Sequence, residues 1–87
     1  MELEEIRAKI DTVDEEILRL FLERMTLAEE VAVYKKARQL PILNEGRERE
    51  ILDRVARQAG DRGEDAKQLF STLFSISRTR QAQLMEG

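Results

Sequence analysis

The sequence contains no cysteine, no histidine and no tryptophan, and only one proline. Without cysteine no disulfide can form. Without cysteine and histidine, the common ligands of zinc and copper and most nucleophile–base pairs are missing. Any chemistry must therefore rely on arginine, lysine, glutamate, glutamine or serine side chains, and we expect neither a metal nor a cofactor.

Long apolar runs and an excess of positive charge are also absent. No apolar run approaches the roughly 20 residues of a membrane span, and the N-terminus is acidic rather than a basic signal sequence. The formal net charge of −3 argues against a nucleic-acid surface, which depends on clustered positive charge. We therefore expect a cytoplasmic protein that binds neither membrane nor nucleic acid. Its basic residues, if functional, serve a small anion.

The apolar pattern predicts one all-α domain over residues 1–87, with helices at about residues 2–38, 45–59 and 64–85. Pro41 ends the first helix, because it removes a backbone donor and disfavours helix before it. Asn44 is a good N-cap for the second helix and Gly60 a good C-cap. Glycines 60 and 63 mark a turn-rich linker before the third helix.

The first helix carries an apolar seam that advances in alternating steps of three and four residues. The seam consists of Leu3, Ile6, Ile10, Val13, Ile17, Leu20, Arg24, Leu27, Val31 and Tyr34. Its exception is Arg24, which must be paired or bind an anion, since burying an unpaired charge costs several kcal/mol. Taken alone, Arg24 is also compatible with a salt bridge or a register-fixing residue. The two shorter helices can cover only part of a seam about 50 Å long, so we predict that a second subunit covers the rest and that the protein is a dimer.

Polar residues also interrupt the apolar stripe of the third helix. Leu69, Phe70, Leu73, Phe74 and Leu84 continue this stripe, but Ser77 and Gln81 occupy two of its positions. On the first helix, Lys35 lies eleven positions after Arg24, on nearly the same face and about 16 Å along the axis. These four polar residues all interrupt apolar patterns in the direction that would line one interior cavity.

Two antiparallel first helices that cross near Ile17 or Leu18 would add a further cation. Arg7 lies beside the same seam, seventeen residues before Arg24, too far to share a ligand within one helix. In the crossed pair, Arg7 of one subunit falls beside the Arg24 to Lys35 segment of the other. The geometry therefore predicts an anion site built from two chains.

These patterns together resemble the all-helical chorismate mutases, the AroQ class, over essentially the whole chain. Spacing, helix order and polar exceptions all agree. The segments that carry the resemblance are Ile6 to Asp11, Val13 to Leu18, Leu22 to Arg24, Leu27 to Val31, Tyr34 to Lys35, Pro41 to Ile42, and Arg47 to Glu50. The resemblance implies an intertwined dimer that rearranges chorismate to prephenate in the biosynthesis of phenylalanine and tyrosine.

The resemblance also implies how chorismate is held. Arg24, with Arg7 of the partner chain, would bind its two carboxylates. Ser77 and the backbone around Asn44 would assist. Many relatives carry aspartate where this chain has Asn44, a change that we expect to alter affinity more than competence.

The remaining implied roles concern the other atoms of chorismate. Lys35 and Gln81 would donate hydrogen bonds to the ether oxygen of the breaking C–O bond. Arg47 and Glu48 would lie at the hydroxyl end. Such residues suffice, because a one-substrate pericyclic rearrangement needs orientation and stabilisation of charge on the ether oxygen, but no nucleophile, metal or base.

Two other functions remain open at this point. An isochorismate pyruvate-lyase would have the same fold and nearly the same polar residues. A non-catalytic helical dimerisation or regulatory module would use the cations only in ion pairs, although it would place Leu or Ala at the positions of Ser77 and Gln81. The sequence is equally compatible with a free-standing enzyme and with a domain of a larger one.

Overall fold

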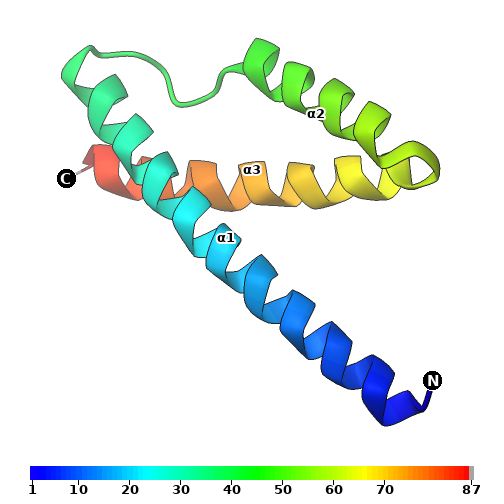
Figure 1. The fold of residues 1–87 in the computed structure, drawn as a ribbon. Coiled ribbons are helices and arrows are strands. Elements are labelled where there is room, and N and C mark those ends of the chain that lie inside the picture. The colour runs from blue at the N-terminus through cyan, green and yellow to red at the C-terminus, as the bar shows by residue number, and fades with distance from the viewer. Residues whose placement is uncertain (87) are drawn as a thin grey trace.

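The computed structural model describes residues 1–86 and places three α-helices in them: α1 (Leu3–Ala37), α2 (Glu45–Ala59) and α3 (Gly63–Glu86). A short 3-10 helix, η1 (Gly60–Arg62), joins α2 to α3. As Figure 1 shows, α2 and α3 lie side by side as an antiparallel pair, and α1 crosses α3 obliquely. The predicted all-α class is confirmed.

The end of α1 is set by its backbone as well as by Pro41. Gln39 adopts a positive φ of 57°, the left-handed conformation that commonly follows a helix. The N–H of Leu40 donates to the carbonyl of Lys35 at 2.9 Å, and the N–H of Gln39 donates to the carbonyl of Lys36 at 3.3 Å. These two bonds form a Schellman motif, which turns the chain away from α1 and towards α2.

The predicted caps of α2 are confirmed. The side chain of Asn44 accepts a hydrogen bond from the backbone N–H of Arg47 at 3.0 Å, and Gly60 follows the helix with a φ of 58°. A side chain at Gly63 would meet the carbonyl oxygen of Ala56 at 3.0 Å. Glycine at this position therefore lets α3 start in close contact with the last turns of α2.

Helix α3 is the central element, because both α1 and α2 pack against it. On the α2 side, Ile51, Val55 and Phe74 form a buried cluster, covered at its edges by Leu52, Ala66 and Phe70. On the α1 side, the buried residues are Ala28 and Ala32, whose small side chains allow α1 to approach α3 closely.

One residue of the predicted apolar stripe on α3 does not lie on the buried face of that helix. Leu69 is 58% exposed, whereas Phe74, Ser77 and Gln81 are buried. The inward face is centred on the line that runs through Ala66, Phe70 and Phe74. Leu69 lies about 100° away from its neighbour Phe70 around the helix axis and therefore falls outside this face.

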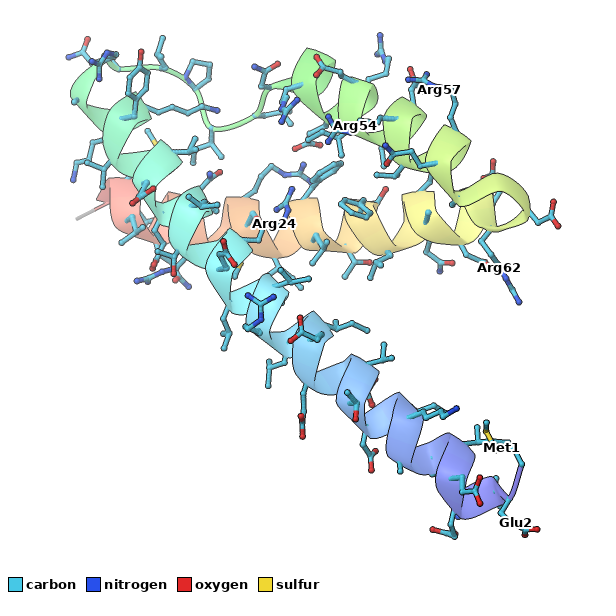
Figure 2. The ribbon with its side chains drawn as sticks, in the orientation of Figure 1. Met1, Glu2, Arg24, Arg54, Arg57 and Arg62 are labelled. Carbon is cyan, nitrogen blue, oxygen red and sulfur yellow. The ribbon has the colours of Figure 1, made fainter. Side chains whose placement is uncertain are left out.

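The N-terminal half of α1 projects away from the other helices, and Figure 2 shows Met1 and Glu2 at its free end, far from Arg24. Its large apolar side chains are between 40% and 57% exposed from Ile6 onwards. They are Ile6, Ile10, Val13, Ile17, Leu18, Leu20 and Leu22. None of the helices within residues 1–86 is long and apolar enough to cross a membrane. This half of the seam is left without a covering element from its own chain.

Candidate active site

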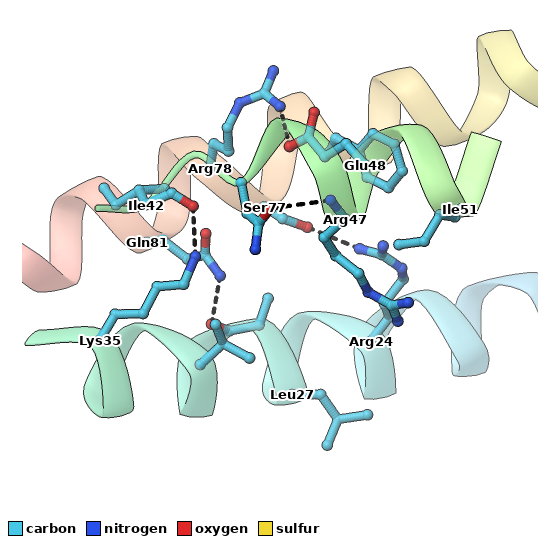
Figure 3. Close-up of a pocket in the computed structure, with 14 residues that line it drawn as sticks. Arg24, Leu27, Lys35, Ile42, Arg47, Glu48, Ile51, Ser77, Arg78 and Gln81 are labelled. Carbon is cyan, nitrogen blue, oxygen red and sulfur yellow. Dashed lines mark hydrogen bonds and ion pairs between the residues drawn. The ribbon is translucent and has the colours of Figure 1, made fainter. Parts of the chain in front are cut away.

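A cavity of about 300 Å³ lies between the C-terminal half of α1, the connection to α2, the first turns of α2 and the C-terminal half of α3 (Figure 3). Seven of the eight predicted site residues line it. These are Arg24, Lys35, Asn44, Arg47, Glu48, Ser77 and Gln81. Leu27, Val31, Ile42, Ile51 and Phe74 supply apolar parts of the wall. Residues from three helices and one connection thus meet at a single concave surface.

Arg24 is held in this cavity by two neutral neighbours on α3. Its Nη1 donates to the Oγ of Ser77 at 3.1 Å, and its guanidinium carbon lies 5.6 Å from the centre of the Phe74 ring, within range of a cation–π interaction. The pKa of Arg24 is lowered, chiefly because burial disfavours the charged form and secondly because Arg47 brings a like charge near. The guanidinium nevertheless stays protonated at neutral pH. A bound anion would favour its charged form and so counteract both the burial and the like charge of Arg47.

Lys35 is held by a backbone group. Its Nζ donates to the carbonyl oxygen of Ile42 at 2.7 Å, a contact that Figure 3 shows at the end of the cavity nearest the connection. No acidic residue within residues 1–86 forms an ion pair with it. An ammonium has three N–H donors, so Lys35 keeps two of them for a ligand.

Gln81 is oriented by α1. Its Nε2 donates to the carbonyl oxygen of Ala28 at 3.0 Å, and the side chain lies on the same side of the cavity as Lys35 (Figure 3). The residue is only 8% exposed, so this bond fixes which end of the amide carries the donors. The second N–H of Nε2 is free of that bond and can serve a ligand oxygen.

The three predicted residues from the start of α2 have different surroundings. Asn44 uses its side-chain oxygen to cap the helix. Arg47 pairs with Glu50 at 2.7 Å on the exposed side of α2. Glu48 pairs instead with Arg78 of α3, thirty positions later in the chain. Of the cavity-lining residues that the structure describes, Glu48 is the single acidic one.

Sequence reasoning missed Arg78, although it lines the cavity and pairs with Glu48. A signal was present, because Arg78 directly follows Ser77 and lies three positions before Gln81. These are neighbouring positions on a helix surface. The sequence analysis gave Arg78 no role, and the structure places it at the boundary between the exposed face of α3 and the buried stripe.

Arg7 does not reach the cavity of its own chain. It lies on the projecting half of α1, where its Nη1 pairs with Glu4 at 3.2 Å and its side chain is 62% exposed. The chain by itself therefore brings together seven of the predicted residues and leaves the eighth on the uncovered seam.

The chemistry of the cavity is that of an anion site with oriented donors. Among residues 1–86, four cationic side chains line it, from Arg24, Lys35, Arg47 and Arg78, against the one carboxylate of Glu48. Arg24, Lys35 and Gln81 are each held by an uncharged oxygen, so their positions are fixed without neutralising the two cations. Such an arrangement can bind carboxylates and stabilise a developing negative charge on an oxygen.

Comparison with known proteins assigns the chain to a family. The family model described as chorismate mutase type II matches residues 6–82. The chain belongs to this family. A chorismate mutase of Methanocaldococcus jannaschii is 36% identical over 97% of this chain and 88% of its own length. Membership of the type II chorismate mutase family makes the chain an isomerase of the all-helical class.

Two further relatives show the range of the family. A bifunctional chorismate mutase/prephenate dehydratase of Aquifex aeolicus is 48% identical over 64% of this chain, which spans 16% of that longer protein. A 4-amino-4-deoxychorismate mutase of Streptomyces venezuelae is 36% identical over 95% of this chain and 80% of its own length. No solved structure gives a significant match.

Proposed function

We propose that this protein, a type II chorismate mutase by family, converts chorismate to prephenate for the biosynthesis of phenylalanine and tyrosine. The observation that carries the proposal is the set of donors from Arg24, Lys35 and Gln81, each oriented by a neutral oxygen towards one cavity. The same proposal places the reaction in the cytoplasm.

In this mechanism the chain holds its substrate rather than attacking it. The ether C–O bond breaks while a C–C bond forms within the same molecule, so no proton needs to be transferred. Arg24 binds one carboxylate of chorismate. Ser77 keeps the guanidinium in place and the backbone around Asn44 assists, whereas Arg47 lies with Glu48 at the hydroxyl end. The apolar wall then restricts the flexible enolpyruvyl group to a reactive orientation.

Lys35 and Gln81 act on the oxygen of the breaking bond. Negative charge grows on the ether oxygen in the transition state, and both side chains keep free N–H donors after bonding Ile42 and Ala28. Because their positions are fixed beforehand, little reorganisation is needed when the charge develops. By analogy with one donor of the oxyanion hole in an acyl-transfer enzyme, each such donor is expected to contribute about 3 to 4 kcal/mol of transition-state stabilisation.

The proposal includes an intertwined homodimer in which Arg7 of the partner chain binds the second carboxylate. The uncovered apolar side chains on the N-terminal half of α1 support it, because monomeric proteins rarely expose a continuous apolar surface of this kind. The exposed position of Arg7 on the same half-helix supports it as well.

A second candidate substrate is 4-amino-4-deoxychorismate, favoured by the similarity to the Streptomyces venezuelae enzyme over nearly the whole chain. The purified protein should therefore be incubated separately with chorismate, 4-amino-4-deoxychorismate and isochorismate, and the products identified by mass and chromatography. Conversion of chorismate to prephenate is the expected result. Release of pyruvate from isochorismate in place of a rearranged product would establish the lyase reaction instead. No conversion of any of the three would refute the catalytic proposal.

A further inference from the structure

The Glu48–Arg78 ion pair joins α2 to α3 at the edge of the cavity, and nothing described so far gives it a role. The side chain of Glu48 is 24% exposed and that of Arg78 is 36% exposed, so the pair is partly shielded from solvent. Figure 3 shows the pair on the opposite side of the cavity from Lys35. Its location allows it to contact a ligand.

A substrate's hydrogen-bond donor has few acceptors to choose from here. Chorismate carries two carboxylates, an ether oxygen and one hydroxyl, so the hydroxyl is its main donor. Glu48 is the single carboxylate among the described residues that line the cavity, and the amide oxygen of Asn44 is already engaged as a helix cap. By matching donors with acceptors, the hydroxyl is assigned to Glu48.

The ion pair decides which ligand groups can bind favourably to the Glu48 carboxylate. Nη1 of Arg78 contacts Oε2 of Glu48, which leaves the lone pairs of Oε1 for another donor. An uncharged hydroxyl needs only such a lone pair. An alkyl amine in the same place is protonated at neutral pH, as the ordinary lysine pKa of about 10.4 indicates. It would then meet a carboxylate whose charge is already balanced, beside the positive charge of Arg78.

We infer that Arg78, through its ion pair with Glu48, makes the site selective for a hydroxyl over an ammonium at the substrate position that Glu48 contacts. Arg78 is thus a specificity-determining residue that acts through Glu48 and does not touch the reacting atoms. This inference rests on the proposed function and deepens it, because it chooses between the two candidate substrates: chorismate is preferred over 4-amino-4-deoxychorismate.

The test compares kcat/KM for these two substrates in the wild type and in Arg78→Met, which keeps a side chain of similar length but removes the charge. The substrates differ only at one substituent, so a general loss of packing lowers both values and leaves their ratio unchanged. We expect the wild type to prefer chorismate. In Arg78→Met the ratio should shift towards the amino substrate by at least about tenfold, the factor that corresponds to about 1.4 kcal/mol.

Two further variants make the test independent of how well Arg78→Met folds. Arg78→Lys keeps the positive charge and should retain most of the wild-type selectivity. Glu48→Gln leaves Arg78 without its carboxylate, so the ratio should move in the opposite direction, further in favour of chorismate.

The matched control is Arg80→Met. Arg80 lies on the same helix and pairs with Glu29 at 2.7 Å, with a side chain that is 42% exposed, but it does not line the cavity. Its removal should leave the substrate ratio unchanged. An unchanged ratio in Arg78→Met, an equal shift in Arg80→Met, or a wild type that prefers the amino substrate would each overturn the inference while leaving the mutase activity established. A wild type that converts neither substrate would refute the proposed function, and the inference with it.

Discussion

Replacing Gln81 by glutamate tests the centre of the proposed mechanism with a change of one functional group. The amide of Gln81 has two N–H donors, one engaged by the carbonyl of Ala28 at 3.0 Å and one assigned to the ether oxygen. An ionised carboxylate has none. At neutral pH, Gln81→Glu therefore loses both bonds and sets a charged oxygen against the Ala28 carbonyl.

The size of the effect follows from these contacts. Losing the donor to the ether oxygen removes about 3 to 4 kcal/mol of transition-state stabilisation, so kcat should fall by at least about 10²-fold near pH 8. Leaving a buried acceptor unsatisfied costs a further 1 to 3 kcal/mol or so of folding stability. Because the position is only 8% exposed, burial raises the pKa of the introduced carboxyl above its ordinary value of about 4.3.

The activity of Gln81→Glu should accordingly rise as the pH is lowered from about 8 to about 5, since only the protonated carboxyl can donate. Recovery should stay partial, because a carboxylic acid has one O–H and must serve either the Ala28 carbonyl or the substrate. A carboxyl whose pKa is raised in the folded state stabilises the protein at low pH, and this contribution is lost as the pH rises through the folded pKa. Thermal unfolding of the variant should therefore shift to higher temperature on acidification.

The assay follows the disappearance of the conjugated diene of chorismate by ultraviolet absorbance at each pH. Gln83→Glu is the matched control, because Gln83 lies on the same helix but is exposed and contacts Arg80 outside the cavity. It should show the wild-type profile. Full activity of Gln81→Glu with no pH dependence over this range would show that Gln81 is not the donor and that the mechanism is wrong at its centre.

Two other predictions address the remaining donors and the second subunit. Lys35→Ala should lower kcat by at least about 10²-fold with a smaller effect on KM. Lys36→Ala is the control, because the Nζ of Lys36 donates to the carbonyl of Leu84 at 3.5 Å and the residue does not line the cavity, so both constants should stay nearly unchanged. Equal losses in the two variants would remove Lys35 from the mechanism. Mixing Arg7→Ala chains with Arg24→Ala chains should restore part of the activity, because one site of each heterodimer then keeps both arginines. Sedimentation should show dimers in these mixtures, and either a stable monomer or no recovery after proven subunit exchange would contradict the shared site.

Several features of the site were accessible from the sequence because they interrupt a pattern. Arg24 interrupts the apolar seam of α1, and Ser77 and Gln81 interrupt the stripe of α3, so each was identified from periodicity alone. Lys35 was added because it lies eleven positions after Arg24 on nearly the same face of the helix. Arg47 and Glu48 lie at positions where charge is unremarkable, and their roles came only from resemblance to the family.

Other features have no sequence signal of this kind. The carbonyls of Ile42 and Ala28 orient Lys35 and Gln81, but every residue has a carbonyl, and only the tertiary arrangement decides which one is used. Leu69 was misplaced because steps of three and four allow the inward face to be centred on either of two adjacent lines. Arg78 was missed for the related reason that the edge of such a face is not sharply defined.

The neutral partners of Arg24 and Lys35 also bear on how the reaction ends. A salt bridge would release each cation only when the substrate displaced its carboxylate, but the Ser77 hydroxyl and the Ile42 carbonyl hold the cations without neutralising their charge. Prephenate has the same two carboxylates as chorismate, so this attraction acts on product and substrate alike. We therefore expect the product to inhibit the site as it accumulates, so that net flux depends on the reaction that next consumes prephenate.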